Sequence, residues 1–174
     1  RDPDAPVIMT TADGISEKYR HPVTYFKTAL GLVLLREQIL GKARFDYAFR
    51  KYIRAWAYKH PKPDDFFRSM ENGSGEDLSW FWKEWFYTTW NVDQAVTDVK
   101  YVKNDPASGA LITIENLREM ALPVVAKITE ENGKVQTIKL PVEIWQHGPK
   151  WVFRYNSTSK IKQVILDPDN QLPD

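Results

Sequence analysis

The spacing of apolar residues changes once along this chain, near residues 91–96. Before that point apolar side chains recur three and four residues apart, as in helices that bury one face; after it they alternate with polar residues, as in strands. Five of the seven tryptophans also precede residue 91. Because helices and strands segregate in this way in α+β proteins, we predict two units. They are a helical subdomain over residues 1–92 and a small antiparallel β-sandwich over residues 93–174.

Turn and cap residues divide the helical half. Residues 1–20 are rich in Asp, Pro and Thr without a sustained period, and are predicted to form a loop. Helices are then expected over residues 22–40, 43–59, from 63 to the Asn-Gly-Ser-Gly run at 72–75, and 77–88. Pro22 suits a first helical turn and Gly41 a position just past a helix end. Ser74 and Asp77 have the spacing of a capping box for the last helix.

The second half shows six stretches of strand character, joined by segments of turn residues. They lie at residues 96–102, 110–116, 122–129, 135–145, 151–155 and 161–166. Pro141 falls inside the longest of them. Because proline cannot donate to a strand ladder, we predict that this strand is an edge strand or is broken by a bulge at Pro141.

Composition excludes several classes of function. The net charge of +1 indicates no nucleic-acid footprint, and no apolar run approaches the roughly 20 residues of a membrane span. The absence of cysteine removes disulfides, thiolate nucleophiles and Cys-ligated zinc.

The chain also lacks the common catalytic motifs. His21, His60 and His147 are far apart, and neither H-E-x-x-H nor G-x-S-x-G occurs. A metal site is therefore not expected within this chain. The adjacent carboxylates at 64–65 and 76–77 are better explained by helix-terminal electrostatics than by acid–base chemistry.

Residues 80–87 form an aromatic run, WFWKEWFY. It has two readings, a packed helical core or a platform on which a ligand stacks. The helical spacing of the rings favours the core. Tyr25, near the start of the first long helix, is by itself unremarkable.

Three stretches of the helical half form an ordered set. They are VTYFKTALGLVLLREQILG (residues 23–41), FDYAFRKYIRAWAYKHP (45–61), and DDFF (64–67) followed by GEDLSWFW (75–82). The set comprises a long helix beginning Tyr-x-Lys, a Leu-Gly stop, a Tyr-x-x-x-Trp helix, and an Asp-Phe helix before an aromatic one. In this order it resembles the aminopeptidase N (gluzincin) family of zinc metallopeptidases, just downstream of the zinc motif, and is most like bacterial members. Many members also carry a β-sandwich after the catalytic domain.

The resemblance implies a role for one tyrosine. In the family, two His and one Glu hold zinc, the Glu of H-E-x-x-H activates a water, and the Tyr of Tyr-x-Lys donates a hydrogen bond to the oxyanion of the tetrahedral intermediate. That Tyr falls on Tyr25, with Tyr19 as the fallback if the preceding loop aligns differently. Many members have Gly directly after the Lys, where this chain has Thr28, which leaves open how closely the neighbouring backbone approaches.

The resemblance also implies what this chain lacks. It begins Arg-Asp-Pro-Asp without Met and contains no zinc ligand or catalytic Glu of the family. We therefore expect a C-terminal part of a zinc-dependent aminopeptidase, inactive alone, with zinc present only in the intact protein. Its expected partners are the upstream zinc-binding domain and a peptide substrate, and an exported location, periplasm or cell envelope, is favoured. The alternative is a non-catalytic module that binds a glycan or a protein, which predicts exposed aromatic rings on the sandwich.

Overall fold

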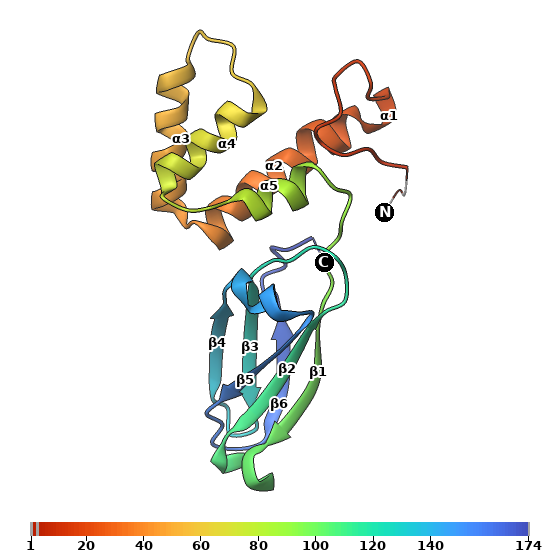
Figure 1. Cartoon of the computed structure of the whole chain (residues 1–174). Coiled ribbons are helices and arrows are strands. Elements are labelled where there is room, and N and C mark those ends of the chain that lie inside the picture. Colours follow the sequence, from red (N-terminus) through yellow and green to blue (C-terminus); the bar gives the residue numbers. More distant parts are fainter. Residues whose placement is uncertain (1, 3, 174) are drawn as a thin grey trace. The chain divides into compact units, whose positions relative to one another are not determined.

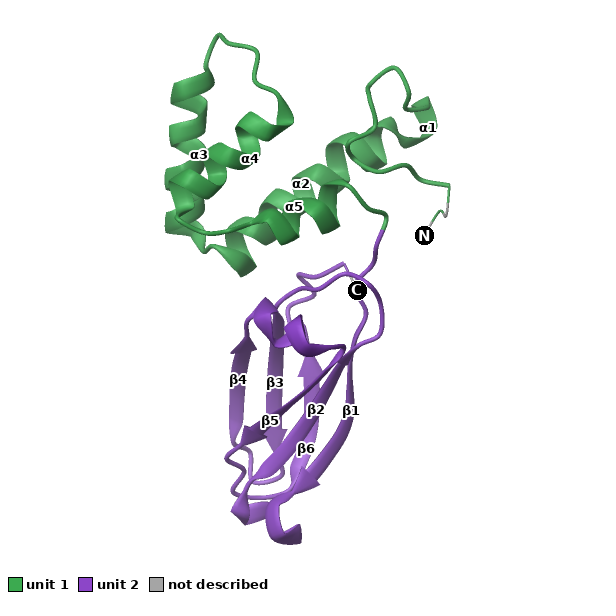
Figure 2. Cartoon of the chain, in the orientation of Figure 1, with its two compact units in different colours: residues 1–89 green, residues 90–174 purple. Residues whose placement is uncertain are grey.

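The computed structural model describes residues 2 and 4–173 of the chain. It divides into two compact units, Arg1–Thr89 and Trp90–Asp174 (Figure 2). The first contains the helices and the second two small antiparallel sheets (Figure 1). The predicted α+β layout is thereby confirmed.

One long helical segment opens the helical unit and changes its hydrogen-bonding pattern along its length. It comprises α1 (Glu17–Tyr19), a π-helical segment Arg20–Lys27, α2 (Thr28–Leu34) and a second π-helical segment Leu35–Ile39. The helix thus begins before Pro22, and the prediction of a loop up to residue 20 is wrong at its end. Pro22 lies inside the helix, where it cannot donate to the preceding turn, and the wider π turn accommodates a residue without an N–H.

The next two helices form a closely packed pair, α3 (Lys42–Trp56) and α4 (Pro63–Ser74). A Cβ on Gly73 would lie 2.7 Å from both Cα and Cβ of Ala48, so only glycine permits this approach. The predicted stop at residues 72–75 is confirmed, and within that run Gly73 is a packing residue still inside α4. The helix ends at Gly75, whose φ of 68° is left-handed.

The last helix, α5 (Ser79–Phe86), does not begin with the predicted capping box. The hydroxyl of Ser74 donates back to the carbonyl of Glu71, and the backbone N–H of Ser79 donates to Asp77 at 2.9 Å. The side chain of Glu71 accepts hydrogen bonds from the N–H of Leu78 and from Nε1 of Trp82, both at 3.2 Å. A carboxylate on α4 thus fixes the start of α5.

The aromatic run on α5 forms core. Its four buried rings are Phe81, Trp82, Trp85 and Phe86. Trp82 stacks on Phe67 of α4 with 4.6 Å between ring centroids. The core interpretation of this run is confirmed.

Among its described residues, the β unit contains six strands in two three-stranded antiparallel sheets, ordered β1-β2-β5 and β4-β3-β6 (Figure 1). The strands are β1 (Gln94–Tyr101), β2 (Ala110–Asn116), β3 (Val124–Glu130), β4 (Val135–Leu140), β5 (Lys150–Tyr155) and β6 (Ile161–Leu166). Ile112 of one sheet and Ile128 of the other belong to one buried cluster, so the sheets share a core as a sandwich does.

Pro141 ends β4. The strand is an edge strand and stops at Leu140, after which Val142–His147 forms a 3₁₀ helix. The predicted strand over residues 135–145 was therefore too long, because a residue without an N–H cannot continue the ladder. The predicted edge position is confirmed, whereas the strand ends before Pro141 instead of continuing past a bulge.

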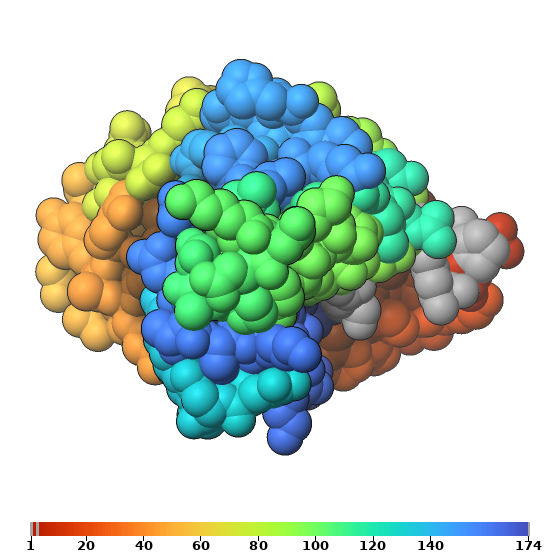
Figure 3. Space-filling model, turned by 90° about the horizontal axis from the view of Figure 1, so that it is seen from below, coloured from red at the N-terminus to blue at the C-terminus, as the bar shows by residue number. Residues whose placement is uncertain are grey.

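The turns at one end of the sandwich lie beside one another, as the view onto that end shows (Figure 3). Ser157 Oγ donates to the carbonyl of Pro106 at 2.7 Å, and Lys134 Nζ donates to the carbonyl of Asn156 at 2.8 Å. Three turns distant in sequence are thereby joined.

Candidate functional site

Tyr25 lies on the outer surface of the π-helical segment Arg20–Lys27. Its side chain is 59% exposed, and its ring stacks on that of His21 with 5.5 Å between centroids. Within the part of the chain that the structure describes, no residue hydrogen-bonds the Tyr25 hydroxyl. The phenol is therefore free to donate to a molecule outside this chain.

Tyr19 differs in this respect. Its hydroxyl donates to a carboxylate oxygen of Asp2 at 3.0 Å and accepts from Lys18 Nζ at 3.1 Å. Lys18 also pairs with Asp2, and the hydrogen bond from Lys18 holds the pKa of Asp2 below its usual value. The fallback tyrosine is thus already engaged.

The backbone immediately after Tyr25 is held by α5. The indole Nε1 of Trp85 donates to the carbonyl of Lys27 at 2.9 Å, and Lys27 Nζ donates to the carbonyl of Thr88 at 3.3 Å. A Cβ on Gly31 would lie 2.2 Å from Nε1 of Trp85. Close approach is therefore achieved at Gly31, one turn beyond Thr28.

Thr28 occupies the position at which many family members have glycine. Its hydroxyl oxygen is buried and has no hydrogen-bond partner among the residues described. Nothing in the structure gives this hydroxyl a function.

An apolar stripe follows Tyr25 along the same helix. We call Phe26, Leu30 and Val33 the apolar stripe; their i, i+4, i+7 spacing places them on one face. All three are exposed, Phe26 at 68% and Val33 at 54%. Contiguous apolar exposure of this kind is typical of a surface that another body covers.

The structure brings no histidines together into a metal site. His21, His60 and His147 are each exposed. Across residues 2 and 4–173, no group of three or more His, Asp or Glu side chains could hold a metal ion. The residues present therefore do not fit the zinc that the resemblance implies for the intact protein. In the same described part, no helix has the length and apolarity to cross a membrane.

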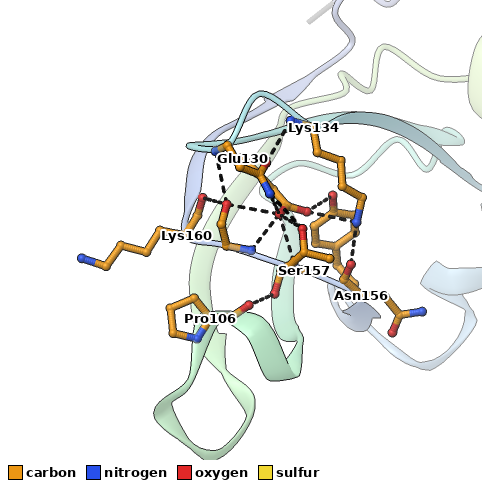
Figure 4. Close-up of polar contacts among 10 residues, drawn as sticks. Pro106, Glu130, Lys134, Asn156, Ser157 and Lys160 are labelled. Carbon is orange, nitrogen blue, oxygen red and sulfur yellow. Dashed lines mark hydrogen bonds and ion pairs between the residues drawn. The ribbon is translucent and has the colours of Figure 1, made fainter.

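Glu130 has a strongly perturbed acidity that the sequence did not signal. It is 1% exposed at the turn end of the sandwich (Figure 4). Burial alone raises the pKa of a carboxyl group, but hydrogen bonds from the Tyr155 hydroxyl and from Thr158 outweigh it. The pKa of Glu130 therefore lies well below its usual 4.5.

Carboxylates with a shifted pKa often mark active sites, but the hydrogen bonds that Glu130 can accept are all made within the fold. One oxygen accepts from Tyr155 at 2.7 Å and faces Lys134 Nζ at 3.1 Å; the other accepts from the N–H of Thr158 at 2.9 Å and of Ser159 at 2.8 Å. Burial, followed by the carboxylate, raises the pKa of Tyr155 to about 12. Glu130 therefore ties strands and turns together rather than facing a ligand.

The alternative of a non-catalytic glycan- or protein-binding module predicts exposed aromatic rings on the sandwich. No aromatic side chain of strands β1–β6 is exposed; Trp151 is partly buried, as is Trp145, which follows β4. Trp145 Nε1 donates to the carbonyl of Leu122 at 2.8 Å. The feature on which this alternative depends is thus missing from the strands.

Comparison with known proteins gives a family match within the helical unit. Residues 3–85 match the family model described as the peptidase family M1 domain. The chain resembles the crystal structure of Legionella pneumophila aminopeptidase A in complex with aspartic acid, with a TM-score of 0.52 and 17% sequence identity. This similarity covers 79% of this chain and 16% of that chain. A comparison with curated proteins found no match.

The family match lies within the helical unit. Residues 3–85 are similar to the peptidase family M1 domain, as the resemblance to the aminopeptidase N family predicted. The likeness to aminopeptidase A, at its low identity, shows a shared fold. The chain spans about one sixth of the length of that structure.

Proposed function

We propose that this chain is part of a zinc-dependent aminopeptidase, in which Tyr25 stabilises the oxyanion formed during hydrolysis of an N-terminal peptide bond. The observation that carries the proposal is the exposed, unpartnered hydroxyl of Tyr25 on a helix matched to peptidase family M1. Tyr19, whose hydroxyl is already engaged by Asp2, is the weaker candidate.

The chemistry of a phenol suits this role. It is a neutral donor, so it costs little when the substrate carbonyl is uncharged and gains strength as negative charge develops on the oxygen. A donor placed on a helix held by Trp85 and Lys27 would meet that charge without reorganising. Removing one such donor typically lowers kcat about 100-fold or more.

The remaining catalytic groups would come from residues that this sequence does not contain. The chain has neither H-E-x-x-H nor a metal-binding group among its described residues. Alone it should therefore bind no stoichiometric zinc and turn over no aminoacyl anilide. In the intact protein, the upstream zinc-binding domain would cover the apolar stripe of Phe26, Leu30 and Val33. This would explain why these apolar side chains are exposed in the present chain.

The test compares Tyr25→Phe with Tyr19→Phe in a protein that includes the upstream residues. Tyr25→Phe should lower kcat by about 100-fold with little change in KM, because a bond made mainly in the transition state is lost. Tyr19→Phe should leave kcat within about twofold, since its hydroxyl serves an internal contact. Zinc content, measured in all samples, should be equal.

Two results would contradict the proposal. One is a large kcat loss in Tyr19→Phe with little effect of Tyr25→Phe. The other is stoichiometric zinc and turnover in the 174-residue chain by itself. That outcome would mean that its own residues form a site.

A further inference from the structure

The outer face of α3 is basic and aromatic. Tyr47, Arg50, Lys51 and Arg54 follow an i, i+3, i+4, i+7 spacing, so they share one face of the helix. All four are exposed, whereas Phe45 and Ala48 on the opposite side are buried.

The positive charge on this face is not balanced by the chain itself. Arg50, Lys51 and Arg54 form no ion pair with any residue in the described ranges. Arg50 contributes to lowering the pKa of Asp46, but both oxygens of Asp46 are bound by Arg36, at 2.7 and 3.0 Å. Three cations thus face solvent on a chain whose net charge is +1.

Tyr58, just beyond α3, is presented in an unusual way. Its side chain is 106% exposed, and its φ is 62°. A bulky residue seldom adopts the left-handed region, which typically costs on the order of 1–3 kcal/mol. Because the side chain is fully exposed among the described residues, this backbone conformation does not serve the core of the helical unit.

We propose that this surface binds an acidic, extended segment of a partner protein. We call Tyr47, Arg50, Lys51 and Arg54 the α3 basic face, and propose that the exposed ring of Tyr58 just beyond the helix extends it. The inference is independent of the proposed peptidase role. Arginine and tyrosine are enriched at protein interfaces, where arginine forms paired hydrogen bonds with carboxylates and tyrosine contributes rigid apolar area.

The spacing of the cations matches such a segment. Arg50 and Arg54 are four residues apart, so their backbone positions are separated by about 6 Å along the helix. Acidic residues at alternate positions of an extended chain are about 6.7 Å apart and point to the same side. Two carboxylates can therefore meet two guanidinium groups at once. A nucleic acid is less suitable, because three clustered cations are few for a phosphate backbone.

The experiment uses the 174-residue chain and a fluorescein-labelled octaglutamate peptide, with binding followed by fluorescence anisotropy at low salt. The triple variant R50E/K51E/R54E should weaken binding about tenfold or more, and added salt should weaken binding to the unmodified chain. The matched control is K127E/K139E/K162E, which makes the same charge change at exposed lysines of the β4-β3-β6 sheet. It should change affinity by less than about twofold. Circular dichroism establishes that both variants are folded.

The possible outcomes distinguish an acidic protein segment from other negatively charged binding partners. Equal losses in the two triple variants would show attraction by overall charge and would overturn the proposal. Tighter binding of a single-stranded oligonucleotide or of phosphatidylserine vesicles than of octaglutamate, at the same salt, would overturn the choice of an acidic protein segment. Tyr58→Ala should weaken binding about threefold, and an unchanged affinity would remove Tyr58 from the surface.

Discussion

Gly31 lies directly against the indole of Trp85, so that a Cβ at Gly31 would come within 2.2 Å of Nε1. The same Nε1 donates to the carbonyl of Lys27, one turn earlier on the helix. The missing side chain at Gly31 thus allows α5 to hold the backbone that carries Tyr25. A contact between two helices thereby positions the proposed oxyanion donor.

The first prediction concerns this contact. Gly31→Ala should destabilise the helical unit by about 3 kcal/mol, because the added methyl group overlaps a ring that is itself buried. Trp85→Phe in the same background should recover part of the loss, since the smaller ring leaves room. A double-mutant cycle measured by chemical unfolding checks this, and simple additivity of the two changes would contradict it.

The second prediction is that a substitution at Thr28 stabilises the helical unit. Thr28→Val removes a buried hydroxyl that has no partner among the described residues, while keeping the shape of the side chain. The free energy of unfolding should therefore rise by about 1 kcal/mol. Thr24→Val, at an exposed position of the same helix, is the control and should be close to neutral. A destabilised Thr28→Val would mean that the hydroxyl does find a partner.

The third prediction tests whether the hydrogen bonds to Glu71 hold the start of α5 in place. Glu71→Ala should cost about 2 kcal/mol, because it leaves the N–H of Leu78 and the indole of Trp82 without their acceptor in a buried setting. Glu71→Gln keeps an acceptor oxygen and should cost less than half as much. Thermal unfolding of the two variants measures the difference, and equal losses would assign the effect to packing.

Glu130 predicts a dependence of stability on pH. The folded pKa of Glu130 is well below the usual 4.5, so its contribution to stability is fully present above pH 4.5 and is lost progressively as pH falls from there through the folded pKa. Glu130→Gln should therefore cost about 3 kcal/mol at pH 7, where an amide group must face several hydrogen-bond donors, and less at pH 3.

The control for this prediction is Glu131→Gln, the exposed neighbour, for which the loss should be small at both pH values. Urea unfolding of both variants at the two pH values provides the comparison. A cost of Glu130→Gln that does not shrink on acidification would contradict the role given to the carboxylate.

Sequence pattern anticipated the elements whose structure depends on neighbouring residues. Strands β2 and β6 begin and end at the residues predicted, because alternation and turn residues mark them locally. The break at Pro141 followed from a missing N–H, which needs no partner to be known. The helical start was misplaced because Pro22 was assigned to a first turn, whereas a π-helical segment surrounds it.

The candidate site, too, was predicted in part from the sequence and decided in part by the tertiary structure. An ordered set of motifs pointed to Tyr25 and to the M1 family, with Tyr19 in reserve. What separates the two tyrosines in the structure is Asp2, which lies 17 residues from Tyr19 in sequence and accepts a hydrogen bond from its hydroxyl. A contact across that distance has no signature in either segment.

By itself the sequence determined the order of helices and strands, the core character of the aromatic run and the resemblance of the helical unit to the aminopeptidase N family, because periodicity, turn residues and motif order are local properties. Only the tertiary structure decided that Gly31 and Gly73 serve as points of close helix contact, and that Glu130 is ionised and buried. A glycine's role depends on what packs against it. The acidity of a carboxyl group depends on donors such as Tyr155, which lies on the other sheet, 25 residues away in sequence, and is brought to Glu130 by the packing of the two sheets.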